Sequence, residues 1–188
     1  MPRDVTDQTA PASAWLERFS PLITRSSRVL EIACGNGRNT RLLAQLSDHV
    51  TAVDIRPMPV VPPGIRFVMA DLENGPWPFH EESFDVLVVV NYLWRPRFAE
   101  LCSSLVHGGL MLYETFSHEQ LTASFGPSRR EHLLETGELL RLVPACWRIV
   151  AFEDGLTRHG AFYQRVAARK TRLNNLISPE LVGLCTDR

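Results

Sequence analysis

Short apolar runs alternate along the chain with segments whose apolar residues recur at helical spacing. The apolar runs predict five β-strands, at residues 28–33, 49–55, 65–72, 83–91 and 110–116. Helical spacing predicts three helices before or between them, at residues 13–23, 38–47 and 95–106. Strands that alternate with helices or irregular crossovers indicate an α/β fold, with a mostly parallel sheet covered on both faces.

The second half of the chain predicts a different ending. Two further strands, at residues 147–155 and 160–170, are separated by a short connection, which is typical of a hairpin and would add one antiparallel strand to the sheet. Helical material is predicted at residues 129–143, and a turn is predicted at "HGG", residues 107–109. The connection at residues 117–144 is long, and such insertions often act as lids or substrate loops.

A glycine-rich turn, "EIACGNG" at residues 31–37, ends the first strand and opens the next helix. Its backbone N–H groups and the helix N-terminus can face a ligand. Asp54 closes the second strand 23 residues after Glu31, which is the spacing at which an acid reaches a pair of ribose hydroxyls. The pattern therefore predicts a nucleoside in the crevice at the carboxyl edge of the sheet.

Two cofactor-binding motifs have glycines at similar spacing to this turn. The dinucleotide fingerprint G-x-G-x-x-G is incomplete, because Thr40 stands where its third glycine should be. The pattern acid-x-Gly-x-Gly-x-Gly is the first motif of the class I S-adenosylmethionine-dependent methyltransferases. The turn resembles it through Glu31, Gly35 and Gly37, with Ala33 at the first glycine position. One extra methyl group there predicts slight crowding rather than loss of binding.

The turn "CGNGRNT" and its helix are similar to those of small bacterial methyltransferases of the tellurite-resistance type. The resemblance covers about residues 28–170 and implies a Rossmann-like class I methyltransferase sandwich with a seven-stranded sheet. It implies that Asp54 binds the ribose, that Asp71 of "MADLE" meets the adenine amino group with Leu72 against the ring, and that Asn91 lies near the methionine end. The implied cofactor-binding set is Glu31, Ala33, Gly35, Gly37, Asn39, Asp54, Ile55, Asp71, Leu72 and Asn91.

The segments "NYLWRP", "YETF" and "GELL" resemble a narrower bacterial methyltransferase subfamily whose substrate is unassigned. They suggest Tyr92, Arg95 and Glu114 as catalytic or acceptor-pocket residues. Glu114 could orient or deprotonate an acceptor, or it could pair with a nearby arginine. "NYLWRP" could equally be an aromatic cluster that packs the end of the fourth strand. Five aromatic side chains are expected near the reacting methyl group: Trp77, Phe79, Tyr92, Trp94 and Phe116.

Composition narrows the choice of partners. The net charge of -1 and the absence of a basic face argue against a nucleic acid, so "QRVAARKTR" is interpreted as a solvated strand exit. No histidine or cysteine pattern predicts a metal site, and Cys34 is interpreted as a small apolar filler rather than a nucleophile. The apolar runs are too short to span a bilayer and no secretory signal is visible, so a cytoplasmic location is expected.

These observations predict one methyltransferase domain over residues 1–188, with a core at about 13–170 and a tail at 171–188. The predicted activity is transfer of a methyl group from S-adenosylmethionine to a small-molecule acceptor, by a monomer or homodimer without a metal. A non-catalytic S-adenosylmethionine-binding protein is the alternative, and an RNA methyltransferase is less favoured. A nicotinamide-dependent oxidoreductase would need a second nucleotide-binding half, which the chain does not offer.

Overall fold

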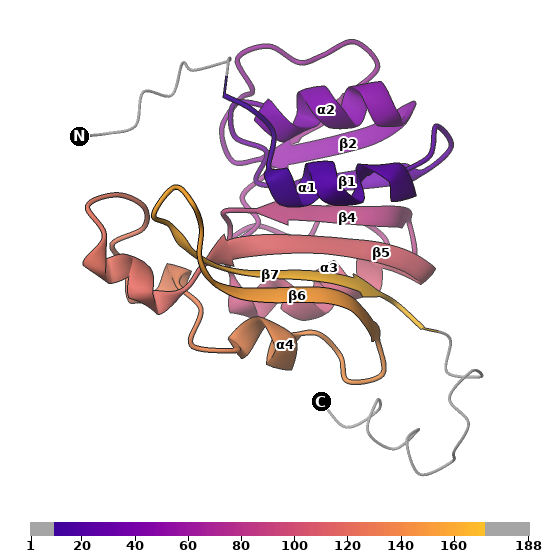
Figure 1. The fold of residues 1–188 in the computed structure, drawn as a ribbon. Helices are drawn as coiled ribbons and strands as arrows, with labels where there is room; N and C mark the ends of the chain where they lie inside the picture. The colour runs from indigo at the N-terminus through magenta and orange to yellow at the C-terminus, as the bar shows by residue number, and fades with distance from the viewer. Residues whose placement is uncertain (1–9, 172–188) are drawn as a thin grey trace.

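Seven strands form a single sheet in the order β3-β2-β1-β4-β5-β7-β6 in the computed structural model, which describes residues 10–171 (Figure 1). The strands are β1 Arg28–Ile32, β2 His49–Asp54, β3 Arg66–Met69, β4 Phe84–Val90, β5 Leu105–Phe116, β6 Arg148–Leu156 and β7 Phe162–Arg169. The first five are parallel, and β7 lies antiparallel to both β5 and β6. The predicted α/β sheet with one antiparallel strand from a terminal hairpin is confirmed.

Helices cover both faces of the sheet (Figure 1). The α-helices are α1 Ala14–Phe19, α2 Arg38–Leu46, α3 Phe98–Ser104 and α4 Glu138–Leu142. Short 3₁₀ turns are η1 Ser20–Leu22, η2 Arg95–Arg97, η3 His118–Thr122 and η4 Arg130–His132. As the prolines of residues 56–64 predict, an irregular segment without a helix connects β2 to β3.

Alternation along the buried strands assigns their side chains to two separate cores. In β4, Val86 and Val88 pack with the apolar faces of α1 and α2. Leu87 and Val89, between and beyond them, pack with α3 and α4 on the opposite face. Successive side chains of a strand point to opposite faces, so an uninterrupted apolar run is what a strand covered on both sides requires.

Two predicted elements differ from the structure. The predicted helix at residues 129–143 is broken into η4 and α4, because Leu134 forms an isolated parallel bridge with Ser117 and Gly137 adopts a positive φ of 64°. The predicted turn at residues 107–109 lies inside β5, where the pairing with β4 shifts register and Gly108 has a φ of 82°. Residues 172–188, which contain nearly all of the predicted tail, lie outside the described part of the chain.

Within residues 10–171, every helix is too short or too polar to cross a membrane.

Candidate functional site

The glycine-rich turn between β1 and α2 follows a left-handed backbone path. Ala33, Gly35 and Gly37 all have positive φ, at 52°, 56° and 80°. Gly37 also has no room for a side chain, since a Cβ there would lie 2.9 Å from Sδ of Met58. The path requires glycine-like freedom at three alternate positions, and at one of them the chain places an alanine.

Replacing Ala33 with glycine is expected to raise the free energy of unfolding by about 0.5–1 kcal/mol, because a left-handed conformation is costly for any residue with a Cβ. Ala99 in α3 has an ordinary helical backbone and an exposed side chain, so Ala99→Gly should instead lower stability by about 1 kcal/mol. Denaturant unfolding of both variants checks the prediction. Equal destabilisation by the two substitutions would contradict it.

Glu31 is buried beneath this turn, at 1% exposure. Its Oε2 accepts a hydrogen bond of 2.5 Å from the Thr40 hydroxyl, while its Oε1 is buried and has no hydrogen-bond partner among the described residues. Burial raises the pKa of Glu31 to about 7, against the opposing effect of the nearby Thr40 and Asn39 side chains. A buried carboxylate oxygen without a donor is costly, and a cationic ligand at the turn would offset that cost.

Asn39, the next polar group of this helix, is itself buried. Its Oδ1 accepts a hydrogen bond of 2.8 Å from the backbone N–H of Ser13. The side chain therefore fastens the segment before α1 to the glycine-rich turn, in addition to lying beside Glu31.

Asp54 ends β2 beside the turn. Its Oδ2 accepts a hydrogen bond of 2.8 Å from the N–H of Gly35, and its Oδ1 accepts one of 2.9 Å from the N–H of Arg56. A carboxylate has about four acceptor sites, so these bonds fix its orientation and leave further sites for ligand hydroxyls. Ile55 follows, an apolar side chain with 59% of its surface exposed.

Asp71, just after β3, holds a tight turn. Its Oδ1 accepts from the N–H groups of Glu73 and Asn74, at 2.9 and 3.0 Å, and these bonds, that of Asn74 first, lower its pKa. Leu72 is buried in the core against the α3 face. Its side chain therefore packs inside the sheet layer, although the resemblance implies contact with the adenine ring.

Tyr92 lies near the carboxylates at the end of β2 and after β3. Burial raises the pKa of its hydroxyl, and the carboxylates of Glu73, Asp71 and Asp54 raise it further. The hydroxyl oxygen is buried and has no hydrogen-bond partner in the described region. A phenol in this environment stays protonated and can donate, so it is unsuited to act as a base at neutral pH.

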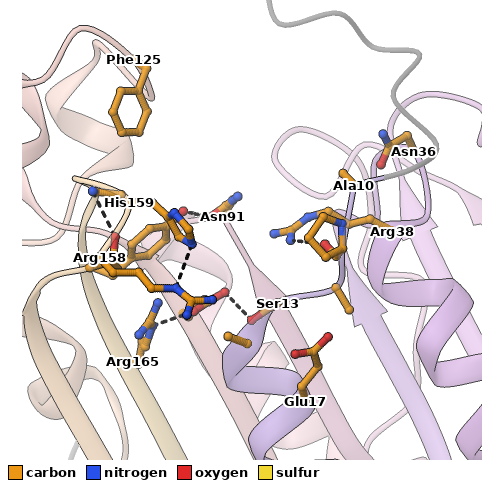
Figure 2. A pocket seen from close by; sticks show the side chains of 17 residues that line it. Ala10, Ser13, Glu17, Asn36, Arg38, Asn91, Phe125, Arg158, His159 and Arg165 are labelled. Atoms are coloured by element: carbon orange, nitrogen blue, oxygen red, sulfur yellow. Dashed lines mark hydrogen bonds and ion pairs between the residues drawn. The ribbon is translucent and has the colours of Figure 1, made fainter.

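A cavity of about 810 Å³ opens beyond the ends of β4 and β5, between the segment before α1 and the β6–β7 hairpin (Figure 2). Asn91, which follows β4, and Glu114 of β5 form part of its polar wall. The other polar lining residues are not predicted from the sequence as acceptor-pocket residues: Ser13, Glu17, Asn36, Arg38, Thr157, Arg158, His159, Tyr163 and Arg165. Its volume lies within the usual range for small-molecule sites.

Glu114 is buried and takes part in an ionic network in the wall of this cavity (Figure 2). Its Oε2 accepts a hydrogen bond of 2.7 Å from Nε of Arg165, and its Oε1 accepts one of 2.5 Å from the Ser13 hydroxyl. Arg165 also lies 3.3 Å from Glu153, which pairs with Arg18. Of the two roles considered from the sequence, the structure shows the pairing with an arginine.

Asn91 is fixed at the mouth of the cavity. It has a positive φ of 59°, and its Oδ1 accepts a hydrogen bond of 2.8 Å from the Tyr163 hydroxyl. The Tyr163 ring stacks on Phe116, with ring centroids 4.4 Å apart. The hydrogen bond and the ring stack together hold Asn91 and Tyr163 in place beside the cavity.

Arg95 does not line the cavity, contrary to expectation. Its Nε and one terminal nitrogen bind both carboxylate oxygens of Glu138, at 2.6 and 2.8 Å. It also donates to the carbonyls of Glu131 and Leu133. A guanidinium engaged on so many sides fastens η2 to the insertion rather than meeting a ligand.

The prediction that Trp77 and Phe79 lie near the reacting methyl group is also wrong. Trp77 donates to the Ser104 hydroxyl at the end of α3, and Phe79 packs edge-on against Phe84 at the start of β4. Their loop leaves β3 at the carboxyl edge and must return to the amino edge to begin β4. Its aromatic residues therefore lie at the opposite end of the sheet from the site.

The insertion at residues 117–144 is anchored more firmly than a free lid. Gln164 of β7 is fully buried, accepts from the N–H of Leu139 and donates to the carbonyl of Glu135. Gln120 is similarly buried and joins the Phe125 carbonyl to the N–H of Phe162. Phe125 is the part of the insertion that lines the cavity.

The fold and the site together define a class of protein. A sheet in the order 3-2-1-4-5-7-6, with a left-handed glycine-rich turn after β1 and an acid after β2, is a nucleoside-binding α/β architecture with its site at the carboxyl edge. Within the described residues, no group of three or more metal-ligating side chains is present.

Comparison with known proteins narrows the class. Residues 29–109 match a family model described as a methyltransferase domain. The chain is 30% identical over 132 residues to a malonyl-[acyl-carrier protein] O-methyltransferase of Bacillus cereus, a match that covers 61% of this chain. That match spans about half, 47%, of the curated relative.

Solved structures agree on the fold. An S-adenosylmethionine-dependent methyltransferase from Mesorhizobium loti aligns with a TM-score of 0.65 at 16% identity, covering 84% of this chain and 98% of that one. A Burkholderia thailandensis 1,6-didemethyltoxoflavin-N1-methyltransferase, solved with S-adenosylhomocysteine, aligns with a TM-score of 0.58 at 22% identity, covering 85% and 79%. These likenesses show that the chain has the Rossmann-like α/β fold of these two methyltransferases. The narrower resemblance to tellurite-resistance-type enzymes stays a prediction.

Proposed function

We propose that this protein transfers a methyl group from S-adenosylmethionine to a small-molecule acceptor. The observation that carries the proposal is the buried Oε1 of Glu31, which lacks a hydrogen-bond partner within residues 10–171 and lies under a left-handed glycine-rich turn. S-adenosylmethionine carries an ammonium group that suits such an oxygen. The family match and the acid at the end of β2 support the same cofactor.

The residues present fit this cofactor along the whole crevice. Gly35 and Gly37 allow close approach of the backbone, and Glu31 would accept from the amino-acid end. Asp54 would accept from the ribose hydroxyls, with Ile55 as an apolar rim. A hydroxyl donor at Tyr92 and the turn at Asp71 would face the adenine, while Asn91 borders the acceptor cavity. The residues that would hold the cofactor are Glu31, Ala33, Gly35, Gly37, Asp54, Ile55, Asp71, Tyr92 and Asn91.

The cofactor would supply a methyl group already activated by a positive sulfur. The chain's own task is then to hold an acceptor in line with that group and to keep water out, and such positioning can contribute about 7–11 kcal/mol. Asn91 and Tyr163, held together by a hydrogen bond, form the rigid boundary at which an acceptor atom would be presented. Glu114 acts as a positioning residue, because both its oxygens are bound within the protein.

A small-molecule acceptor is supported by the size of the open cavity and by its charge. The segment before α1, the β6–β7 hairpin and Phe125 line it, its volume of about 810 Å³ suits a small molecule, and the net charge of -1 does not suit a nucleic acid. The similar proteins act on varied acceptors: one is named for malonyl-[acyl-carrier protein], and another was solved with 1,6-didemethyltoxoflavin.

Cofactor affinity is expected to rise with pH between about 6 and 8. Burial raises the pKa of Glu31 to about 7, and only the ionised carboxylate attracts an ammonium group. Because the folded chain binds this proton more firmly than the unfolded chain, the same group lowers the free energy of unfolding as pH rises from about 4.5 to 7, by on the order of 3 kcal/mol. Titration calorimetry with S-adenosylhomocysteine at pH 6, 7 and 8 measures the rise in affinity. Glu31→Gln should bind weakly with no rise, and identical pH profiles for the two proteins would contradict the role of Glu31.

The proposed activity is tested by methyl incorporation from labelled S-adenosylmethionine into fractionated cell extract. Label in the small-molecule fraction that depends on active protein is expected. Label in RNA would indicate the less favoured nucleic-acid acceptor. Cofactor binding without label in any fraction would favour the alternative, a non-catalytic protein that senses S-adenosylmethionine or activates a partner.

A further inference from the structure

Some of the charged side chains that line the acceptor cavity form ion pairs, and others do not. Five line it: Glu17, Arg38, Glu114, Arg158 and Arg165. Glu114 and Arg165 neutralise one another inside the wall. Glu17, at the front edge in Figure 2, forms no ion pair with either remaining arginine within the described residues. Arg38 and Arg158 therefore line the cavity without forming an ion pair within residues 10–171.

Arg158 projects from the turn between β6 and β7 at one wall of the cavity (Figure 2). Its Nε donates a hydrogen bond of 3.1 Å to Nε2 of His159, which orients the guanidinium. Its terminal nitrogens have no protein acceptor within residues 10–171. An oriented guanidinium with free terminal N–H groups is well suited to a carboxylate or phosphate, which it can bind through two parallel hydrogen bonds.

Arg38 belongs to the opposite wall and to the cofactor side. It follows Gly37 at the start of α2, its terminal nitrogen donates to the Pro11 carbonyl at 3.1 Å, and its charge acts on Glu31. Figure 2 shows Arg38 and Arg158 on the two sides of the hollow. An anion at Arg158 is thus separated from the amino-acid end of the cofactor, which lies toward Glu31.

The cavity also has apolar surface beside these polar groups. Phe125 and Ala161 line the cavity, and the Tyr163 ring is held in place by its stack on Phe116. We propose that the methyl acceptor is an anionic molecule with an apolar body, whose carboxylate or phosphate binds Arg158 while its reacting atom lies at Asn91 and Tyr163. This inference rests on the proposed function, and it assigns Arg158 as the residue that selects the acceptor.

The test uses the full chain saturated with S-adenosylhomocysteine, with three matched probes: phenylacetate, phenyl phosphate and the neutral phenylacetamide. Ligand-detected NMR measures each dissociation constant. At least one anionic probe should bind ten-fold or more tightly than the amide, and whichever anion binds better identifies the oxyanion. In Arg158→Gln this preference should fall below about three-fold. Arg148→Gln, at the far end of β6, removes an exposed arginine outside the cavity and should retain the preference.

Equal binding of acid and amide, binding of no probe, or an unchanged preference in Arg158→Gln would overturn the inference. S-adenosylhomocysteine affinity, measured on the same samples, distinguishes failure of the anionic-acceptor proposal from failure of the methyltransferase proposal. If S-adenosylhomocysteine binds but no anion is preferred, only the anionic-acceptor proposal fails. If the wild-type chain does not bind S-adenosylhomocysteine, the methyltransferase proposal fails.

Discussion

Replacement of Arg165 by methionine is expected to lower the free energy of unfolding by about 3–5 kcal/mol at pH 7. The Glu114 side chain is only 6% exposed and would lose its 2.7 Å ion pair, retaining the Ser13 hydroxyl as its hydrogen-bond donor. An unpaired buried charge costs more than the original pair contributed. For a chain of this length the loss corresponds to a fall in Tm of roughly 6–20 °C, measurable by calorimetry.

The double variant Arg165→Met/Glu114→Met is the matched control, since it removes the charge together with its partner. It should recover most of the lost stability, because hydrophobic replacement of a buried pair is often neutral. A double variant as unstable as the single one would show that Arg165 acts through packing rather than charge.

Replacement of Asp54 by asparagine is expected to weaken S-adenosylhomocysteine binding roughly 30- to 150-fold, or about 2–3 kcal/mol. Hydrogen bonds from ribose hydroxyls to an ionised carboxylate are stronger than those to an amide, and removing the charge forfeits that difference for both hydroxyls. Asparagine is preferred to alanine, because its single carbonyl oxygen can keep one of the two bonds that Asp54 accepts from the N–H groups of Gly35 and Arg56, whereas alanine loses both. Loss of those bonds would mix a folding defect with the binding defect.

Asp48→Asn supplies the control for this measurement. Asp48 lies just before the other end of β2 and pairs with Arg25 on the surface, so its substitution changes the charge equally without touching the crevice. Its cofactor affinity should match that of the wild type. Wild-type affinity in Asp54→Asn, measured by titration calorimetry, would remove Asp54 from the ribose site.

The position of the glycine-rich turn beside Asp54 could be predicted because its signals are local. Gly35, Gly37 and Asp54 lie within a strand–turn–helix–strand unit whose geometry is set by neighbouring residues. Their positive φ values and strand-end position are consequences of the same short segment. The spacing alone therefore placed these three residues at one edge of the sheet.

The acceptor cavity could not be predicted in the same way, because its wall is assembled from distant segments. Glu114 and Arg165 are 51 residues apart, and they meet only because the antiparallel register of β5 and β7 places them directly opposite. Glu153 faces Arg165 from the other neighbouring strand. With the hairpin register known, this ladder of alternating charge would have identified Glu114 as part of an ion pair.

Arg95 was predicted wrongly from a local motif. The motif suggested a catalytic or acceptor-pocket role, whereas Arg95 forms a structural ion pair with Glu138. "NYLWRP" follows β4 directly, but Pro96 starts the turn of η2 that directs the Arg95 side chain toward Glu138, 43 residues later. Neither the register nor the partner is encoded near the motif. Strand-end position indicates proximity to a site, and the partner decides the role of the side chain.

The central claim is that the glycine-rich turn and Asp54 form a site for S-adenosylmethionine, and titration calorimetry of the purified chain tests it most directly. The account predicts that S-adenosylhomocysteine binds with one site per chain and that NAD gives no measurable heat, because Thr40 is buried in a hydrogen bond to Glu31 where the dinucleotide fingerprint has its third glycine. Binding of NAD in preference to S-adenosylhomocysteine, or binding of neither, would contradict it.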